Sequence, residues 1–205
     1  FFKDAMINKN GYDNIDEVMK RNVKPLSAGE VKREIENGAL ILDTRIPNSF
    51  EKGFIKGSMN IGLNGTYAVW IGTLIDINRP LVFVTKEGKE HESILRAARV
   101  GYENVKGYLK GGITAWVNDG NPMDKIQSIT PQEFADKIIP IAIGTGKENP
   151  ETSSGQVILD VRRPGEFETA HVKNAEHLEL ASLQKNLGSL DKKKNYLIHC
   201  AGGYR

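Results

Sequence analysis

The residues best suited to chemistry stand at the end of the sequence, where its single cysteine, Cys200, is followed by a glycine-containing loop and an arginine. Glycine lets successive backbone N–H groups turn toward one point, where they favour a negative charge. The loop therefore predicts a nucleophilic thiolate, with a pKa of the Cys200 thiol below the ordinary value of about 8.5. Arg205 can hold an anionic group through paired hydrogen bonds. The residues predicted to bind a substrate are Ala201, Gly202, Gly203, Tyr204 and Arg205.

Other interpretations of this cysteine stay open. An unpaired cysteine at the end of an apolar strand is often only a small buried side chain. A cysteine phosphatase, or an enzyme like arsenate reductase, also uses a cysteine loop. Phosphatase loops hold five residues between Cys and Arg, whereas four separate Cys200 from Arg205, which favours a pocket for one terminal sulfur atom over a phosphate. His199 is expected to be an ordinary strand side chain and is given no role.

The segment that leads to the cysteine belongs to an internal repeat. Residues 40–63 and 157–180 align without a gap, and each begins with an apolar run that ends at an aspartate. Such runs are typical of buried strands in a parallel sheet. The aligned pairs include Asp43 with Asp160, Arg45 with Arg162, Pro47 with Pro164 and Phe50 with Phe167.

The flanking residues extend the repeat in both directions. Upstream, each copy has a Ser or Thr three residues before a Glu, a capping box that predicts a helix start. Downstream, residues 81–85 and 196–200 form a further apolar run, so that Thr85 corresponds to Cys200. The repeat predicts two tandem α/β domains, each a central parallel sheet flanked by helices. Residues 140–156 are expected to be a surface loop inserted into the second copy.

Four stretches together resemble the rhodanese family of sulfurtransferases: "ILDTR", "ILDVRRPGEF", "GYENVKGYLKGGITAW" and "CAGGYR". The resemblance implies an α/β sandwich around a five-stranded parallel sheet. It also implies that Cys200 carries a sulfane sulfur as a persulfide and passes it to an acceptor, while the residues from Ala201 to Arg205 bind the anion. Thr85 cannot carry such a sulfur, so the first copy is predicted to be inactive. A non-catalytic rhodanese-fold binding module is the remaining alternative for the whole chain.

A narrower resemblance concerns residues 65–84, which are similar to the first, inactive rhodanese module of proteins in which a metallo-β-lactamase-type persulfide dioxygenase precedes two rhodanese modules. It implies a role in sulfide and persulfide detoxification. It also implies an iron-bearing domain upstream, and no cofactor in this chain beyond the persulfide on Cys200. The expected organisation is a connector at 1–24, the inactive domain at 25–122, and the cysteine-bearing domain at 123–205, which is expected to be incomplete at its C-terminus.

Composition narrows the classes of partner. The 205 residues carry a formal net charge of +2 with acidic and basic residues interspersed, which argues against a nucleic-acid partner. The longest apolar run is shorter than the roughly 20 residues that a membrane span needs. One cysteine excludes an internal disulfide, so a reducing cytoplasm is the expected location. The expected partners are small sulfur-containing donors and thiol or sulfite acceptors, and a homo-oligomer is left open.

Overall fold

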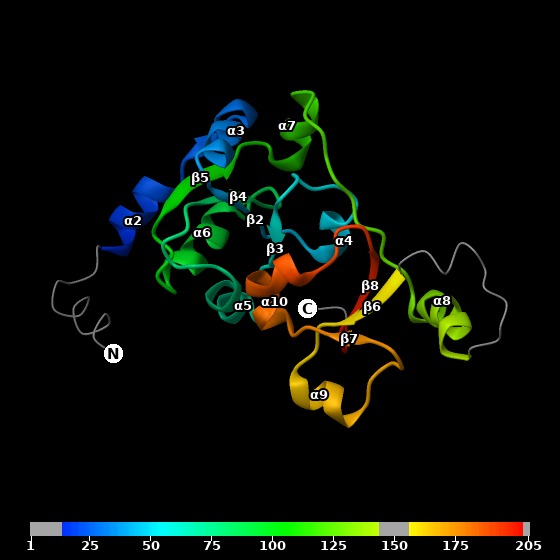
Figure 1. Cartoon of the computed structure of the whole chain (residues 1–205). Coiled ribbons are helices and arrows are strands. Elements are labelled where there is room, and N and C mark those ends of the chain that lie inside the picture. The colour runs from blue at the N-terminus through cyan, green and yellow to red at the C-terminus, as the bar shows by residue number, and fades with distance from the viewer. Residues whose placement is uncertain (1–13, 144–155, 203–205) are drawn as a thin grey trace. The chain divides into compact units, whose positions relative to one another are not determined.

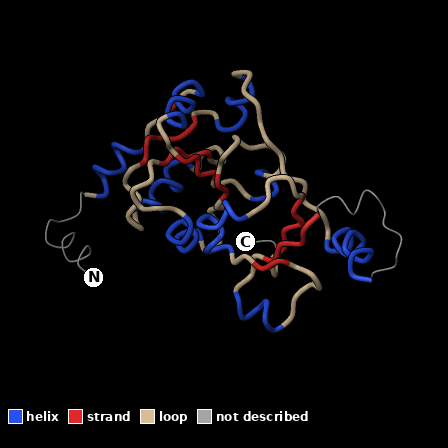
Figure 2. The backbone as a smooth tube through the Cα atoms, viewed as in Figure 1, coloured by secondary structure: helices blue, strands red, loops and turns tan. Residues whose placement is uncertain are grey.

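The computed structural model describes residues 14–143 and 156–202, and the chain divides into two compact units, Phe1–Gln127 and Ser128–Arg205 (Figure 1). The first unit contains a five-stranded sheet in the order β1-β5-β4-β2-β3, in which every neighbouring pair is parallel. Figure 2 draws the strands of the chain in red. Its strands are β1 (Pro25–Leu26), β2 (Leu40–Asp43), β3 (Met59–Asn60), β4 (Leu81–Val84) and β5 (Val105–Leu109).

Helices cover both faces of this sheet, as Figure 1 shows. Because both faces are covered, the central strand β4 is apolar and buried at all of its positions. The predicted parallel sheet flanked by helices is therefore confirmed. One face carries α2 (Ile15–Asn22), α5 (Tyr67–Leu74) and α6 (Glu90–Ala98); the other carries α3 (Ala28–Glu36) and α7 (Gly112–Asn118), and the short α4 (Pro47–Phe50) follows β2.

Helix α2 lies in the segment that the sequence suggests to be a connector. Its residues Val18, Met19 and Asn22 are buried, and the two apolar ones belong to the core cluster that also contains α5 and α6. The Asn22 amide donates a hydrogen bond of 3.0 Å to the carbonyl of Glu103, just before β5. This helix is therefore part of the first unit. A domain preceding it stays a prediction.

The second unit repeats the arrangement with a three-stranded parallel sheet, in the order β7-β6-β8, among its described residues. Its strands are β6 (Gln156–Asp160), β7 (Glu176–His177) and β8 (Asn195–His199), and its helices are α8 (Pro131–Ile143), α9 (Pro164–Thr169), α10 (Leu180–Asn186) and the 3-10 turn η1 (Leu187–Ser189).

Both predicted helix starts are confirmed. Ser27 accepts from the amide of Glu30, whose carboxylate accepts from the Ser27 amide at 2.8 Å. Thr130 and Glu133 exchange the same two bonds at the start of α8. The predicted surface loop over 140–156 is wrong at both ends, since α8 continues to Ile143 and β6 already begins at Gln156. Residues 144–155 lie outside the described part of the chain.

The two sheets share one register. In the first unit Asp43 lies opposite Asn60 on one side and Val84 on the other. In the second unit Asp160 lies opposite His177 and His199 in the same way. Both strands β4 and β8 end one residue earlier than the sequence predicts. Thr85 and Cys200 are therefore the first residues after their strands.

Replacement of Gly107 by Ala tests the packing of β1 on β5. Gly107 has φ +141°, and a Cβ atom there would stand 2.3 Å from the backbone carbonyl oxygen of Lys24. Because backbone cannot move aside cheaply, Gly107→Ala should lower the free energy of unfolding by at least about 2 kcal/mol. Urea denaturation measures the change. Gly72→Ala, on an open face of α5, is the control and should leave stability unchanged or slightly raised; equal effects of the two would contradict the clash.

Candidate functional site

Cys200 stands at the carboxyl end of β8, where the chain leaves the sheet. It is half-buried, whereas Ala201 and Gly202 after it are exposed. Loops at the carboxyl ends of parallel strands are where α/β folds place their ligands. The remaining predicted binding residues, Gly203, Tyr204 and Arg205, lie outside the described residues, so their anion-binding role stays a prediction.

An aspartate–arginine fork stands beside this strand end. The Asp160 carboxylate is fully buried, and Arg162 binds it with Nε at 2.9 and 3.0 Å and with Nη2 at 2.6 Å. Nη2 also donates 2.7 Å to the carbonyl of Ala170, which ties the end of α9 back to the sheet. Next to the fork, the amide of Val161 donates 3.1 Å to the carbonyl of His199. The fork thus fixes the segment against which the residue before Cys200 is held.

The charge of Asp160 is maintained despite its burial. Desolvation is the largest single influence and raises the pKa of this carboxyl. The hydrogen bonds from Arg162 and the nearby His199 together outweigh it, so the pKa of Asp160 lies below its usual value. Asp160 is therefore a buried anion paired with the Arg162 guanidinium and not a proton donor at neutral pH.

The first unit contains the same fork without the thiol. Arg45 binds Asp43 with Nε at 3.0 Å to both oxygens and with Nη2 at 2.6 Å, and Nη2 reaches the carbonyl of Gly53 at 2.8 Å. At the end of the neighbouring strand the first unit has Thr85, which is 5% exposed. The fork is therefore common to both units, and the cysteine distinguishes them.

An acidic side chain binds the backbone of the loop after Thr85. Glu90, five residues after Thr85 as Arg205 is after Cys200, accepts a hydrogen bond of 3.2 Å from the amide of Gly88. A carboxylate thus occupies one of the backbone donors of this loop. Helix α6 begins at this residue, so His91 belongs to its first turn.

The family model for the rhodanese-like domain matches residues 27–119 and 143–205, which is most of the chain and covers both copies of the repeat. The chain belongs to the rhodanese family. The two matched segments make it a tandem rhodanese, as the repeat predicts.

Named relatives of this rhodanese are thiosulfate sulfurtransferases. GlpE of Pseudomonas aeruginosa is 32% identical over 99 residues, which cover 48% of this chain and 87% of the relative. GlpE of Coxiella burnetii is 43% identical over 47 residues, which cover 23% of this chain and 44% of the relative, less than half its length. Among solved structures, a thiosulfate sulfurtransferase from Pseudomonas aeruginosa is 18% identical, with 89% of this chain and 39% of that chain covered and a TM-score of 0.40.

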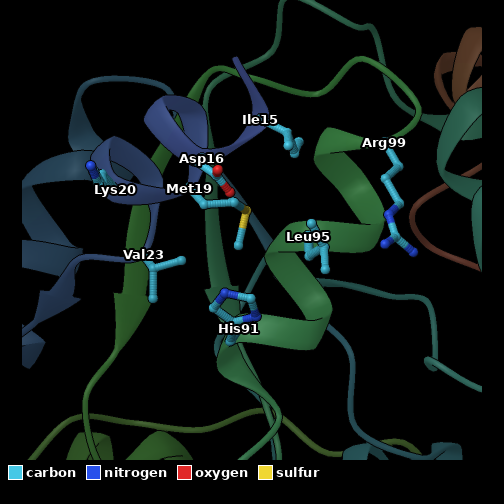
Figure 3. A pocket seen from close by; sticks show the side chains of 8 residues that line it. All are labelled: Ile15, Asp16, Met19, Lys20, Val23, His91, Leu95 and Arg99. Carbon is cyan, nitrogen blue, oxygen red and sulfur yellow. The ribbon is translucent and has the colours of Figure 1, made fainter. Parts of the chain in front are cut away.

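A hollow of about 620 Å³ opens between α2 and α6 of the first rhodanese domain (Figure 3). Its lining mixes apolar side chains with charged ones: Ile15, Asp16, Met19, Lys20, Val23, His91, Leu95 and Arg99. All of these residues belong to the first unit, and Cys200 is not among them.

The described residues of the rhodanese contain neither a metal-binding cluster nor a membrane-spanning helix. Within 14–143 and 156–202, no three His, Cys, Asp or Glu side chains gather in a way that could hold a metal ion. Over the same residues, no helix has the length and apolar character to cross a membrane.

Sequence reasoning assigned no role to the histidines of the second domain. His199 lies opposite Asp160, with Nε2 3.6 Å from Oδ2 of that carboxylate, and His177 contacts the carbonyl of Arg162 through Nε2 at 2.9 Å. The sequence does distinguish them, because each replaces a residue of another type in the first copy. The ungapped repeat aligns His177 with Asn60, and the Thr85–Cys200 match aligns His199 with Val84. These two histidines flank the fork only in the domain that carries the cysteine.

Proposed function

We propose that this rhodanese is a sulfurtransferase that carries sulfane sulfur as a persulfide on Cys200. The observation that supports the proposal is the position of Cys200 as the first residue after β8 in a rhodanese domain, at the place where the sibling domain has Thr85. Kinship with thiosulfate sulfurtransferases favours thiosulfate as a sulfur donor. The loop from Ala201 to Arg205 would bind the donor, with Arg205 pairing with its anionic group.

The proposed reaction has two displacement steps. The Cys200 thiolate attacks the outer sulfur of thiosulfate, so that a new S–S bond forms and sulfite leaves with the electron pair of the broken bond. An acceptor, either a thiolate or cyanide, then attacks the terminal sulfur of the persulfide. Cys200 departs as a thiolate, ready for another donor. No net oxidation occurs, since the sulfane sulfur moves between two nucleophiles.

Mass spectrometry of the intact chain tests this function. Incubation with thiosulfate should add one sulfur atom to Cys200, and cyanide should remove it and yield thiocyanate. A phosphatase would instead hydrolyse p-nitrophenyl phosphate, and thiosulfate would leave its mass unchanged. A binding module would show neither reaction. Either of the last two results would contradict sulfur transfer.

The first rhodanese domain is proposed to be inert, and a thiol alone should not restore it. In a Cys200→Ser background, Thr85→Cys should take up little sulfur from thiosulfate, since Glu90 already occupies the Gly88 amide and repels an anion. Adding Glu90→Arg should raise the rates at which the introduced thiol is alkylated and persulfidated. Efficient sulfur loading by Thr85→Cys without the second change would contradict this account.

The cellular setting of the proposed reaction rests on the resemblance of residues 65–84 to modules that follow a persulfide dioxygenase. We propose a role in sulfide and persulfide detoxification, with an iron-bearing domain in the same protein and thiol persulfides or sulfite as physiological partners. A cytoplasmic location stays a prediction. Sequencing the parent gene tests the fusion, which a gene without a metallo-β-lactamase-type segment would contradict.

A further inference from the structure

Histidines are unevenly distributed between the two domains. Three of the four in the chain lie in the cysteine-bearing domain, at positions where the first domain has an aromatic, an amide and an aliphatic side chain. The pairs are His171 with Phe54, His177 with Asn60 and His199 with Val84. The first two keep the contacts of their counterparts, since His171 stacks on Phe167 as Phe54 stacks on Phe50, and His177 contacts Arg162 as Asn60 contacts Arg45.

The third replacement changes the chemistry of its position. Val84 is fully buried beside Asp43 and contributes only apolar contact. His199 takes the same place beside Asp160, with a side chain that is 19% exposed and a ring that lies 5.5 Å from that of Phe134 in α8. Its Nε2 atom is buried and has no hydrogen-bond partner among the described residues.

A buried ring nitrogen without a hydrogen bond costs stability, so its presence calls for an explanation. The first domain demonstrates that valine fills this position beside a fork with the same aspartate–arginine pairing. His199 is therefore not required by packing. Its Nε2 lies 3.6 Å from Oδ2 of Asp160, at ion-pair distance when the imidazole is protonated.

The charged groups around His199 determine the net charge that protonation of its ring would create. Asp160 is already balanced by Arg162, which binds both of its oxygens. A proton on His199 would therefore leave a net positive charge at the end of β8, one residue before Cys200. The charged residues of α8 with described side chains, Glu133, Asp136 and Lys137, are exposed and thus screened by solvent.

We propose that His199 is a positioning residue for the Cys200 anion: when protonated, its imidazole, with Nε2 3.6 Å from Oδ2 of Asp160, places positive charge one residue before the cysteine. A thiolate and a persulfide are both anions, so both gain from this charge. The role deepens the proposed function and rests on it, because it concerns Cys200 as the nucleophile. The first domain has Val84 and Thr85 at these positions and therefore has neither the histidine nor the cysteine.

The pH dependence of Cys200 alkylation tests the proposal in the full chain, where this cysteine is the only thiol. The rate of reaction with iodoacetamide is measured from acidic to alkaline pH. His199→Val should move the midpoint of the profile about one pH unit upward and lower the rate at neutral pH about tenfold, with the alkaline plateau unchanged. The thermal midpoint of unfolding should stay the same or rise, because valine removes an unsatisfied buried group.

Two further variants separate charge from structure. His199→Asn keeps a polar side chain without the charge and should shift the profile as His199→Val does, which also covers a valine variant that fails to fold. His177→Asn, the matched control, installs the residue of the first domain on the other side of the fork. It should leave the profile unchanged, since His177 contacts the Arg162 carbonyl and not Asp160.

An unshifted midpoint in folded His199→Val or His199→Asn would overturn the proposal, as would an equal shift in His177→Asn. The readout is independent of sulfur transfer. Normal persulfide formation with an unshifted midpoint would reject the role of His199 alone. A shifted midpoint in a chain that takes no sulfur from thiosulfate would support His199 and reject the proposed function.

Discussion

Replacement of Cys200 by Ser should abolish persulfide formation completely. A hydroxyl cannot hold a sulfane sulfur, and the first domain has Thr85 at the equivalent place, so no second carrier exists in the chain. After incubation with thiosulfate, the intact mass of Cys200→Ser should be that of the untreated protein, and cyanide should release no thiocyanate. The fold should be unaffected, because Cys200 lies past the end of β8 and is only half-buried.

The matched control is Thr85→Ser, which makes a similarly small change at the corresponding position of the first domain. It should retain full sulfur loading. Sulfur loading that persists in Cys200→Ser, or that disappears in Thr85→Ser, would show that the reactive group has been misplaced.

Breaking the fork of the first domain should have the largest effect on stability. Arg45→Met leaves the Asp43 carboxylate, fully buried, without the guanidinium that now donates to both of its oxygens. Loss of one partner from a buried ion pair costs about 3–5 kcal/mol. The free energy of unfolding from urea denaturation should fall by that amount, and the loss of the bond to the Gly53 carbonyl adds to it.

Lys56→Met is the control for removing a cation, since Lys56 is exposed and should contribute less than about 1 kcal/mol. The double variant Asp43→Leu/Arg45→Met should recover much of the loss, because an apolar pair leaves no buried charge. A change in Arg45→Met as small as that in Lys56→Met would contradict the assignment of the fork as a stabilising element.

The sequence allowed much of the fold to be predicted because the deciding patterns are local. The strands at Leu40–Asp43 and Leu81–Val84 are continuous apolar runs, and both capping boxes depend on residues three apart. These features need no knowledge of distant contacts. The internal repeat then supplied the tandem arrangement, which the family match confirms.

Other features could not be predicted because they depend on contacts between segments far apart in the chain. The Gly, Pro, Ser and Thr content of residues 140–156 indicates a loop, yet α8 runs on to Ile143. His199 resembles any strand residue until the register places it opposite Asp160. The packing of α2 against α6 likewise joins segments that no periodicity relates. Of the candidate site, Cys200 was found from its loop, whereas the contacts of His177 and His199 with the fork required the register of the sheet.

The fork present in both domains has a consequence for how such a protein can be re-engineered. Asp43 and Arg45 close the same turn as Asp160 and Arg162, although only one of these turns stands beside a thiol. Both domains therefore contain the fork, whereas only the second contains a cysteine. The fold of a domain does not depend on the presence of the thiol. Substitutions in the fork will behave as folding defects in either half, while exchange of the short loop after β4 or β8 changes reactivity on an intact frame. If the first domain is inert as proposed, we expect it to accept a cysteine loop after β4 as a second reaction centre.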